Sequence, residues 1–337
     1  MRSLPTRPAR RPRIAVILAM AIVAAAGLSG CSAFSETSTS ADGKVDVAAA
    51  FYPLEFVTQR VGGDLVDVTD LTQPGQEPHD LELSVAETAA ISEADLVVYE
   101  SVLQPNVGDA VDQNATGTDL DVADVVHLKP FVPGEAHDEE THPEGDDDTS
   151  TDTSTDEHDH DHDHGELDPH FWQNPLLLAK VAEAVAADLA KIDPDHASTY
   201  QANADKLVDE LQQVNQEFTQ GLSQCERSTI VVSHDAFGYL ERYGLTVEGI
   251  AGLSPDAEPT PADLGRLQKL IESDGITTVF SETLAPPALS ETLAKDAGVT
   301  TAVLDPIEGL TDATADEDYL SLMRENLAAL EKANGCS

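Results

Sequence analysis

The chain alternates between strand-like and helix-like segments twice, once on each side of a long helical stretch at residues 195–223. Runs that fit strands lie at 64–71 and 95–99 before that stretch, and at 229–232, 245–250, 276–280 and 300–304 after it. Alternation of this kind with short loops indicates open sheets covered by helices. We therefore predict an α/β fold in which two open α/β lobes are joined by one long, rigid spine helix.

The stretch at 195–223 is long enough, at about 38 Å, to reach from one lobe to the other. Its apolar residues are sparse and recur every three to seven positions, which gives one narrow stripe along a helix. The stripe consists of Tyr200, Leu207, Leu211, Val214, Phe218 and Leu222. A narrow stripe favours a spine between lobes over a helix buried in a core.

The first thirty residues are typical of an export signal. Five arginines precede an apolar segment at 14–28, and Leu28-Ser29-Gly30-Cys31 resembles a bacterial lipobox. A plain transmembrane anchor is the alternative, but about fifteen apolar residues are fewer than the roughly twenty that span a bilayer. We expect cleavage before Cys31, lipidation of that cysteine, and a location on the extracytoplasmic face of the bacterial cell membrane.

The same features divide the chain into parts. We predict a lipoprotein signal peptide at 1–30, a flexible tether at 31–44, an N-terminal α/β lobe at 45–193, a linking helix at 194–223 and a C-terminal α/β lobe at 224–337. Within the N-terminal lobe, residues 135–167 are too polar and too highly charged to bury a core, so we expect a disordered loop there.

The net charge restricts the partners. The full chain carries −45, and the expected mature chain has thirteen basic and sixty-three acidic residues, which gives −50. Such a surface repels nucleic acid and anionic lipid and attracts cations. We therefore exclude nucleic-acid binding and expect a cationic ligand. We also expect the chain to act as a monomer.

The disordered loop carries six of the eleven histidines. Neutral imidazoles bind borderline divalent metals, and neighbouring carboxylates add charge attraction. We interpret the acidic part at 146–157 as a solvated spacer. For the alternating His/Asp part we expect weak accessory metal binding by His158, His160, His162 and His164.

Three further histidines, His79, His170 and His234, each lie where a strand or loop gives way to the next element. Ligands of open α/β sheets bind at the carboxyl ends of strands, so we predict one metal site shared by these imidazoles between the lobes. Asp305, at the end of the last strand, or a water molecule would complete a tetrahedral zinc site. Glu282, or alternatively Glu258, is a candidate for a carboxylate that orients an imidazole through the ring nitrogen that does not bind the metal.

These residues lie in segments that resemble the solute-binding lipoproteins of zinc and manganese ABC transporters, zinc uptake branch. The segments are PHDLELSVAE, DPHFWQNP, SHDAFGYLERYGL, SPDAEPTPADL and VFSETLAPPALSETLAKDAGV followed by LDPIEGL, and the resemblance covers about residues 45–335. It implies one metal, held between two lobes and handed to an ABC metal permease. By motif, the family's ligands fall on His79, His170, His234 and Asp305. Manganese-selective members typically have a glutamate at the third position, so His234 favours Zn²⁺.

Two cysteines remain beyond the lipobox, Cys225 and Cys336. Disulfides persist in exported proteins, so we predict that the two are bonded. Zinc ligation by the pair is the alternative, but neither cysteine has a third cysteine or a histidine near it in the sequence.

Three functions are compatible with a metal site in an exported chain. We predict a binding protein that captures Zn²⁺ for an importer and that is not an enzyme. A manganese receptor of the same family and a surface adhesin lipoprotein that buffers zinc are alternatives. A zinc-dependent hydrolase is a further class, but HExxH and Gly-x-Ser-x-Gly motifs are absent from the sequence.

Overall fold

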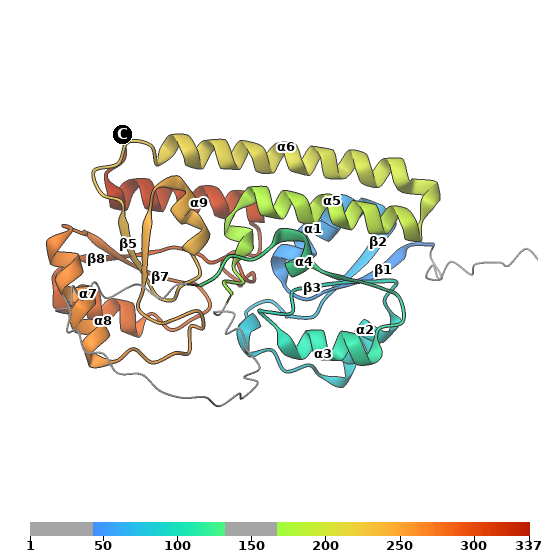
Figure 1. Ribbon diagram of the computed structural model, residues 1–337, viewed down its shortest axis with the longest axis horizontal. Helices are drawn as coiled ribbons and strands as arrows, with labels where there is room; N and C mark the ends of the chain where they lie inside the picture. The colour runs from blue at the N-terminus through green and yellow to red at the C-terminus, as the bar shows by residue number, and fades with distance from the viewer. Residues whose placement is uncertain (1–42, 132–166) are drawn as a thin grey trace, which may run out of the picture. The chain divides into compact units, whose positions relative to one another are not determined.

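The computed structural model describes residues 43–131 and 167–337. Within them the chain forms two four-stranded sheets, and every pair of neighbouring strands is parallel (Figure 1). The first sheet has the order β2-β1-β3-β4 and the second has the order β6-β5-β7-β8. The strands are Val45–Ala49 (β1), Val66–Asp70 (β2), Leu96–Tyr99 (β3), Thr118–Asp121 (β4), Thr229–Val232 (β5), Thr246–Gly249 (β6), Thr278–Ser281 (β7) and Thr300–Val303 (β8).

Helices cover these sheets. In the first half they are Tyr52–Gly62 (α1), Val85–Glu93 (α2), Pro105–Asn114 (α3), Val122–Val126 (α4) and Pro175–Ile192 (α5). In the second half they are Ala197–Gly221 (α6), Pro261–Ser273 (α7), Ala288–Ala297 (α8) and Tyr319–Asn334 (α9). The predicted pair of α/β lobes is confirmed, and the two sheets share the same plan. The exact lobe boundaries stay a prediction.

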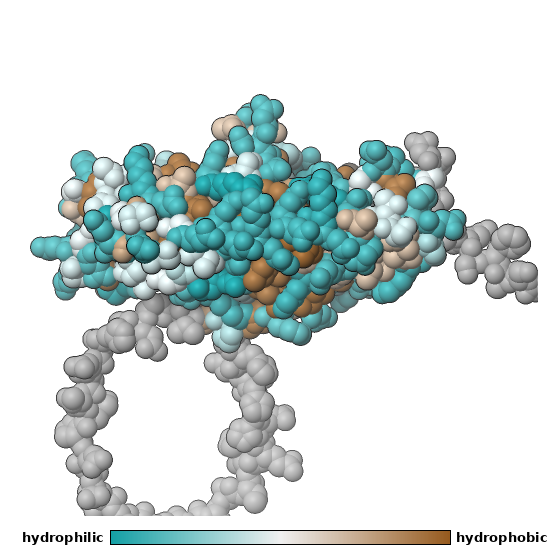
Figure 2. All heavy atoms as spheres, turned by 90° about the horizontal axis from the view of Figure 1, so that it is seen from above, coloured by the Kyte–Doolittle hydropathy of each residue, from teal (hydrophilic) through white to brown (hydrophobic). Residues whose placement is uncertain are grey.

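The spine helix is α6, with 25 residues. It packs on α5 and α1 of the first lobe and on α9 of the second, so it runs along both lobes (Figure 1). All six residues of the predicted apolar stripe are buried. The opposite side of the helix is polar, and the surface seen from this side is largely hydrophilic, with hydrophobic areas scattered over it, the most extended near the middle (Figure 2). The stripe therefore joins the spine to the cores of both lobes.

One continuous apolar core runs through both lobes and the spine. A second, smaller core lies between the second sheet and α7 and α8, around Val279 and Leu267. A disulfide joins Cys225, just beyond α6, to Cys336, just beyond α9, which confirms the predicted bond. Across residues 43–131 and 167–337, no helix combines the length and the apolar character that a bilayer span requires.

Several of the loops that matter below contain short 3₁₀ helices. They span Pro78–Asp80, Phe171–Gln173 and Gly238–Tyr243. The last of these is six residues long. The polar strand β4 was not predicted, because its sequence TDLD lacks the apolar run of a buried strand.

Candidate metal centre

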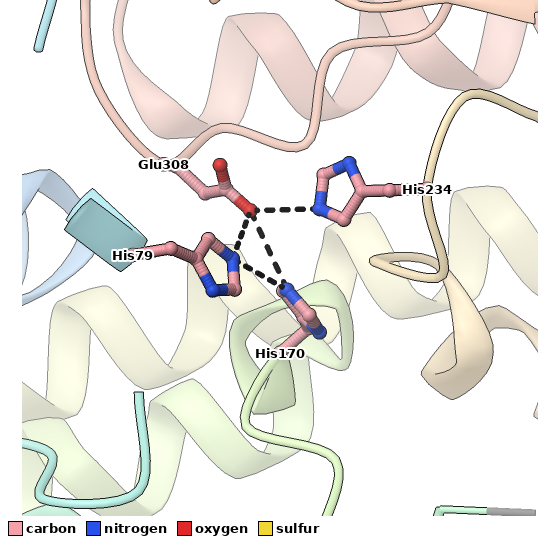
Figure 3. Close-up of side chains that lie close together, drawn as sticks. All are labelled: His79, His170, His234 and Glu308. Carbon is pink, nitrogen blue, oxygen red and sulfur yellow. Dashed lines mark hydrogen bonds and ion pairs between the residues drawn. The ribbon is translucent and has the colours of Figure 1, made fainter. Parts of the chain in front are cut away.

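Four side chains from distant parts of the chain converge on one point: His79, His170, His234 and Glu308 (Figure 3). One potential ligand atom from each lies within 4.8 Å of the other three. Glu308 Oε1 is 3.6 Å from His79 Nε2, 3.5 Å from His170 Nε2 and 3.4 Å from His234 Nε2. The Nε2 atoms of His79 and His170 are 3.3 Å apart.

These separations have the size that a tetrahedral zinc site requires. Zinc binds imidazole nitrogen and carboxylate oxygen at about 2.0–2.2 Å, and the edge of such a tetrahedron is about 3.3–3.5 Å. Four of the six distances among the ligand atoms, at 3.3–3.6 Å, match that edge, and all four atoms lie within 4.8 Å of one another. In addition, neither Nε2 of His234 nor either oxygen of Glu308 has a hydrogen-bond partner among the described residues. The donor set and its spacing therefore fit a divalent cation.

Each ligand comes from a loop that follows a strand or precedes a helix. His79 lies in the short turn Pro78–Asp80, in the connection between β2 and α2. His170 comes directly before the turn Phe171–Gln173 that leads into α5. His234 follows β5 by two residues, and Glu308 follows β8 by five. The parallel strands thus deliver side chains from both lobes to the same place, as the topology predicts.

Two of the imidazoles are oriented by buried carboxylates. Asp168 Oδ1 is 2.9 Å from Nδ1 of His170 and also accepts a hydrogen bond from the His170 backbone N–H at 3.0 Å. Glu282 Oε2 is 2.7 Å from Nδ1 of His234, a close ion pair that does not have hydrogen-bond geometry. A carboxylate on Nδ1 holds the proton there and leaves the Nε2 lone pair free for a metal. Both pairs therefore direct Nε2 toward the shared point.

The local charges favour a cation at this point. Burial by itself would lower the pKa of His234, but the carboxylates of Glu282 and Glu308 outweigh it and raise that pKa to about 10. Asp168 and Glu308 likewise raise the pKa of His170 against the effect of burial. Burial would raise the pKa of Glu308, but the three surrounding imidazoles hold it well below its ordinary range. Protons thus stand where a divalent cation would bind.

The structure brings the three expected histidines together, but not Asp305. The Asp305 carboxylate turns back along its own backbone, where Oδ1 accepts a hydrogen bond from Ile307 N at 2.8 Å. Ile307 has a left-handed backbone conformation, with φ of 60°, and the chain then presents Glu308 to the imidazoles. The carboxylate of the cluster is therefore Glu308, three residues after the one we expected.

Sequence reasoning missed two residues of this centre. Glu308 lies in the segment LDPIEGL. It is the second carboxylate of that segment, after Asp305, and it was therefore an available alternative ligand. Asp168 lies two residues before His170 in DPH, and that short spacing was the signal for a carboxylate partner. Glu282 contacts His234 as expected of an orienting residue, whereas Glu258 is exposed. The predicted accessory histidines at 158–164 and the predicted lipidation site, Cys31, lie outside the described residues.

Comparison with known proteins identifies the family of this chain. The sequence pattern of the family described as "ZnuA: Zinc-uptake complex component A periplasmic" matches residues 47–333. The chain belongs to the ZnuA family. It is 34% identical over 304 residues to the high-affinity zinc uptake system protein ZnuA of Bacillus subtilis, which covers 88% of this chain and 91% of that protein.

The chain is also 35% identical over 324 residues to the zinc-binding lipoprotein AdcA of Streptococcus pneumoniae strain R6. That match covers 94% of this chain but only 60% of AdcA, so the chain spans about three fifths of this relative's length. The Zn(II)-bound ZnuA-like domain of S. pneumoniae AdcA has a TM-score of 0.68 at 32% identity, covering 87% of this chain and 99% of that domain.

Another similar structure is the laminin binding protein Lmb of Streptococcus agalactiae, described as bifunctional with adhesin and metal transporting activity. Its TM-score is 0.69 at 29% identity, covering 86% of this chain and 99% of Lmb. The two-lobed fold is thus shared with a Zn(II)-bound domain and with a protein described as both an adhesin and a metal transporter.

Proposed function

We propose that this chain is an extracytoplasmic binding protein that captures one Zn²⁺ between its lobes and delivers it to an ABC-type metal importer. The observation that carries the proposal is the convergence of three imidazoles and one carboxylate within 4.8 Å, with each imidazole Nε2 3.4–3.6 Å from Glu308 Oε1. The names of its relatives, a zinc-binding lipoprotein and a zinc uptake protein, support the same ligand.

The donor set favours zinc over manganese. Manganese prefers oxygen ligands and stands lowest in the affinity order of the divalent first-row metals. Three nitrogen donors and a single carboxylate instead suit zinc, which commonly takes four such ligands in a tetrahedron. Copper and nickel would also bind imidazoles, so selectivity in the cell depends on which metal is supplied.

The same donor set argues for capture and against catalysis. A catalytic zinc has three protein ligands and keeps a fourth position for water or substrate. Here His79, His170, His234 and Glu308 supply four ligands, and three of them are fully buried. A closed site holds its metal firmly, and release then depends on movement of the parts that carry the ligands.

We further propose that the mature chain is anchored by lipid at Cys31 and acts beside its permease. The lipobox-like sequence supports the anchor, and the relatives named as lipoproteins support the location. The acidic surface, with a net charge of −50 after removal of residues 1–30, would raise the local concentration of cations. A surface adhesin is the second candidate, favoured by the structural likeness to Lmb.

Zinc titration of the mature chain tests the binding proposal. We expect one tight site per chain by competition with a chromophoric chelator, and a loss of about 100-fold or more in affinity for His234→Ala, since one of four ligands is removed. His127→Asn is a matched control, because His127 is exposed, lies outside the cluster and has a left-handed backbone that asparagine tolerates. Unchanged tight binding in His234→Ala would refute the site.

Growth of a deletion strain in chelated medium tests delivery. We expect poor growth that added zinc restores and that the wild-type gene complements, whereas the gene for His234→Ala does not. Normal growth of the deletion strain would argue against import and would favour the adhesin or a zinc buffer.

A further inference from the structure

The residue that the sequence singled out as a ligand, Asp305, has a different place in the structure. It begins the segment 305–308, whose last residue is Glu308. The Asp305 side chain is 6% exposed, yet it is not among the side chains that converge on the metal centre. A buried carboxylate that does not bind the metal requires another reason to be there.

The hydrogen bonds of Asp305 supply that reason. Its Oδ1 accepts from Ile307 N at 2.8 Å, which closes the turn through the side chain. Asn326 on α9 fixes the backbone of Asp305 from both sides: Asp305 N donates to Asn326 Oδ1 at 2.8 Å, and Asn326 Nδ2 donates to Asp305 O at 2.6 Å. The start of the turn is therefore rigidly attached to α9.

Ile307 is the strained point of the turn. Its φ is 60°, in the left-handed region that β-branched residues rarely adopt, and its side chain is fully buried. Such a conformation persists only where the surroundings over-determine it. The bond from Ile307 N to Asp305 Oδ1 is one such constraint, and the burial of the isoleucine side chain is another.

The turn is also held from the segment that carries His170. Trp172 Nε1 and Gln173 Nε2 both donate to Pro306 O, at 2.8 and 2.6 Å. Both donors are fully buried. The backbone just before Glu308 is thus tied to the residues just after His170, so the two ligands share one framework.

We propose that Asp305 is the positioning residue for Glu308: its carboxylate oxygen holds the left-handed turn at Ile307 that presents the Glu308 carboxylate to the three imidazoles. What the turn requires at position 305 is a hydrogen-bond acceptor and not a negative charge. This inference rests on the proposed zinc site, since it assigns the residue that places one of its ligands.

The difference between an acceptor and a charge gives a direct test. Asp305→Asn keeps a side-chain oxygen that can accept from Ile307 N but removes the charge, whereas Asp305→Ala removes both. Glu308→Gln removes the charge of the ligand itself. Asp312→Asn is a matched control, because Asp312 is an exposed carboxylate a few residues further along.

The mature full-length chains would be titrated with Zn²⁺ alone, and the visible absorption spectrum of Co²⁺ bound in place of zinc would report the ligand set. We expect Asp305→Asn and Asp312→Asn to stay within about threefold of the wild-type affinity and to keep the wild-type Co²⁺ spectrum. We expect Asp305→Ala to weaken zinc binding by about 10–100-fold, as for loss of an orienting contact, and to give the Co²⁺ spectrum of Glu308→Gln.

A loss of tenfold or more in Asp305→Asn would overturn the proposal, as would an unchanged affinity in Asp305→Ala. If Asp305→Ala does not fold, the comparison of Asp305→Asn with Glu308→Gln still decides between acceptor and charge. The wild-type titration separates this inference from the proposed function: no zinc binding by the wild-type chain refutes the function, whereas a change among variants alone bears on Asp305.

Discussion

The metal centre depends on residues that do not reach its central point. Asp168 and Glu282 each lie on the far nitrogen of an imidazole, at 2.9 and 2.7 Å, and are almost fully buried. Buried carboxylates are costly unless they are paired, so each carboxylate and its histidine stabilise one another. The remaining imidazole, that of His79, is more exposed than the other two, at 11%. The backbone N–H of His79 donates to the Glu77 side chain at 3.2 Å.

Replacement of Glu282 by glutamine tests this pairing at the residue scale. Glutamine keeps the shape but removes the charge that favours a proton on Nδ1 of His234, so we expect zinc affinity to fall by about 10–100-fold. Competition titration would measure the change. Glu258→Gln is the matched control, since Glu258 is an exposed glutamate of the same lobe. Equal affinities in the two variants would show that Glu282 does not orient His234.

At the scale of elements, a pair of half-buried carboxyl groups lies between α1 and β2. Asp70 is the last residue of β2, and Glu55 lies in the first turn of α1. Burial and the neighbouring charge of Glu55 raise the pKa of Asp70 to about 8. The backbone N–H of Thr72 donates to Asp70 Oδ1 at 3.0 Å, so Asp70 also fixes the start of the connection that carries His79.

This pair predicts a pH-dependent stability. The folded chain keeps the Asp70 proton up to about pH 8, whereas the unfolded chain loses it near pH 4, so stability falls as the pH rises between these values. Asp70→Asn mimics the protonated acid and removes this loss. We expect the variant to gain, relative to wild type, on the order of 3 kcal/mol between pH 5 and pH 9.

Urea unfolding of both chains at several pH values would measure the difference, in which the other titrating groups cancel. Parallel curves for wild type and Asp70→Asn across this range would show that Asp70 ionises as readily in the folded chain as in the unfolded one.

The elements also show what the sequence could predict and what it could not. Strands β5 and β7 are buried apolar runs, and the stripe of α6 has helical spacing, so local pattern was enough. Strand β4 is polar and largely half-buried, and only its pairing with β3 makes it a strand. The histidines were predictable from their places in loops beside strands and helices. Glu308 was not, because its direction depends on the left-handed backbone of Ile307, which the sequence does not reveal.

At the scale of the whole molecule, the spine and the closing helix are tied together covalently. The disulfide joins Cys225 to Cys336 across a separation of 111 residues, just beyond the ends of α6 and α9. The core that α6 shares with both lobes already holds these helices together. The disulfide therefore stabilises the protein mainly by restricting the conformational freedom of the unfolded chain.

Removal of the disulfide should lower the stability without removing the metal centre. We expect Cys225→Ser with Cys336→Ser to lose up to about 4–5 kcal/mol of unfolding free energy. Zinc affinity should stay within about twofold of wild type, because neither cysteine belongs to the cluster. Chemical denaturation and zinc titration of the same samples would measure both. An unchanged stability would contradict the expected restriction of the unfolded chain.

The central claim is that three imidazoles and Glu308 hold one zinc ion between the two lobes. A crystal structure of the zinc-loaded mature chain, with anomalous data collected on both sides of the zinc edge, tests it most directly. We predict one strong peak bonded to Nε2 of His79, His170 and His234 at about 2.0–2.1 Å and to Glu308 at about 2.0–2.2 Å. A peak coordinated by Asp305 in place of Glu308, or no peak among these histidines, would contradict the account.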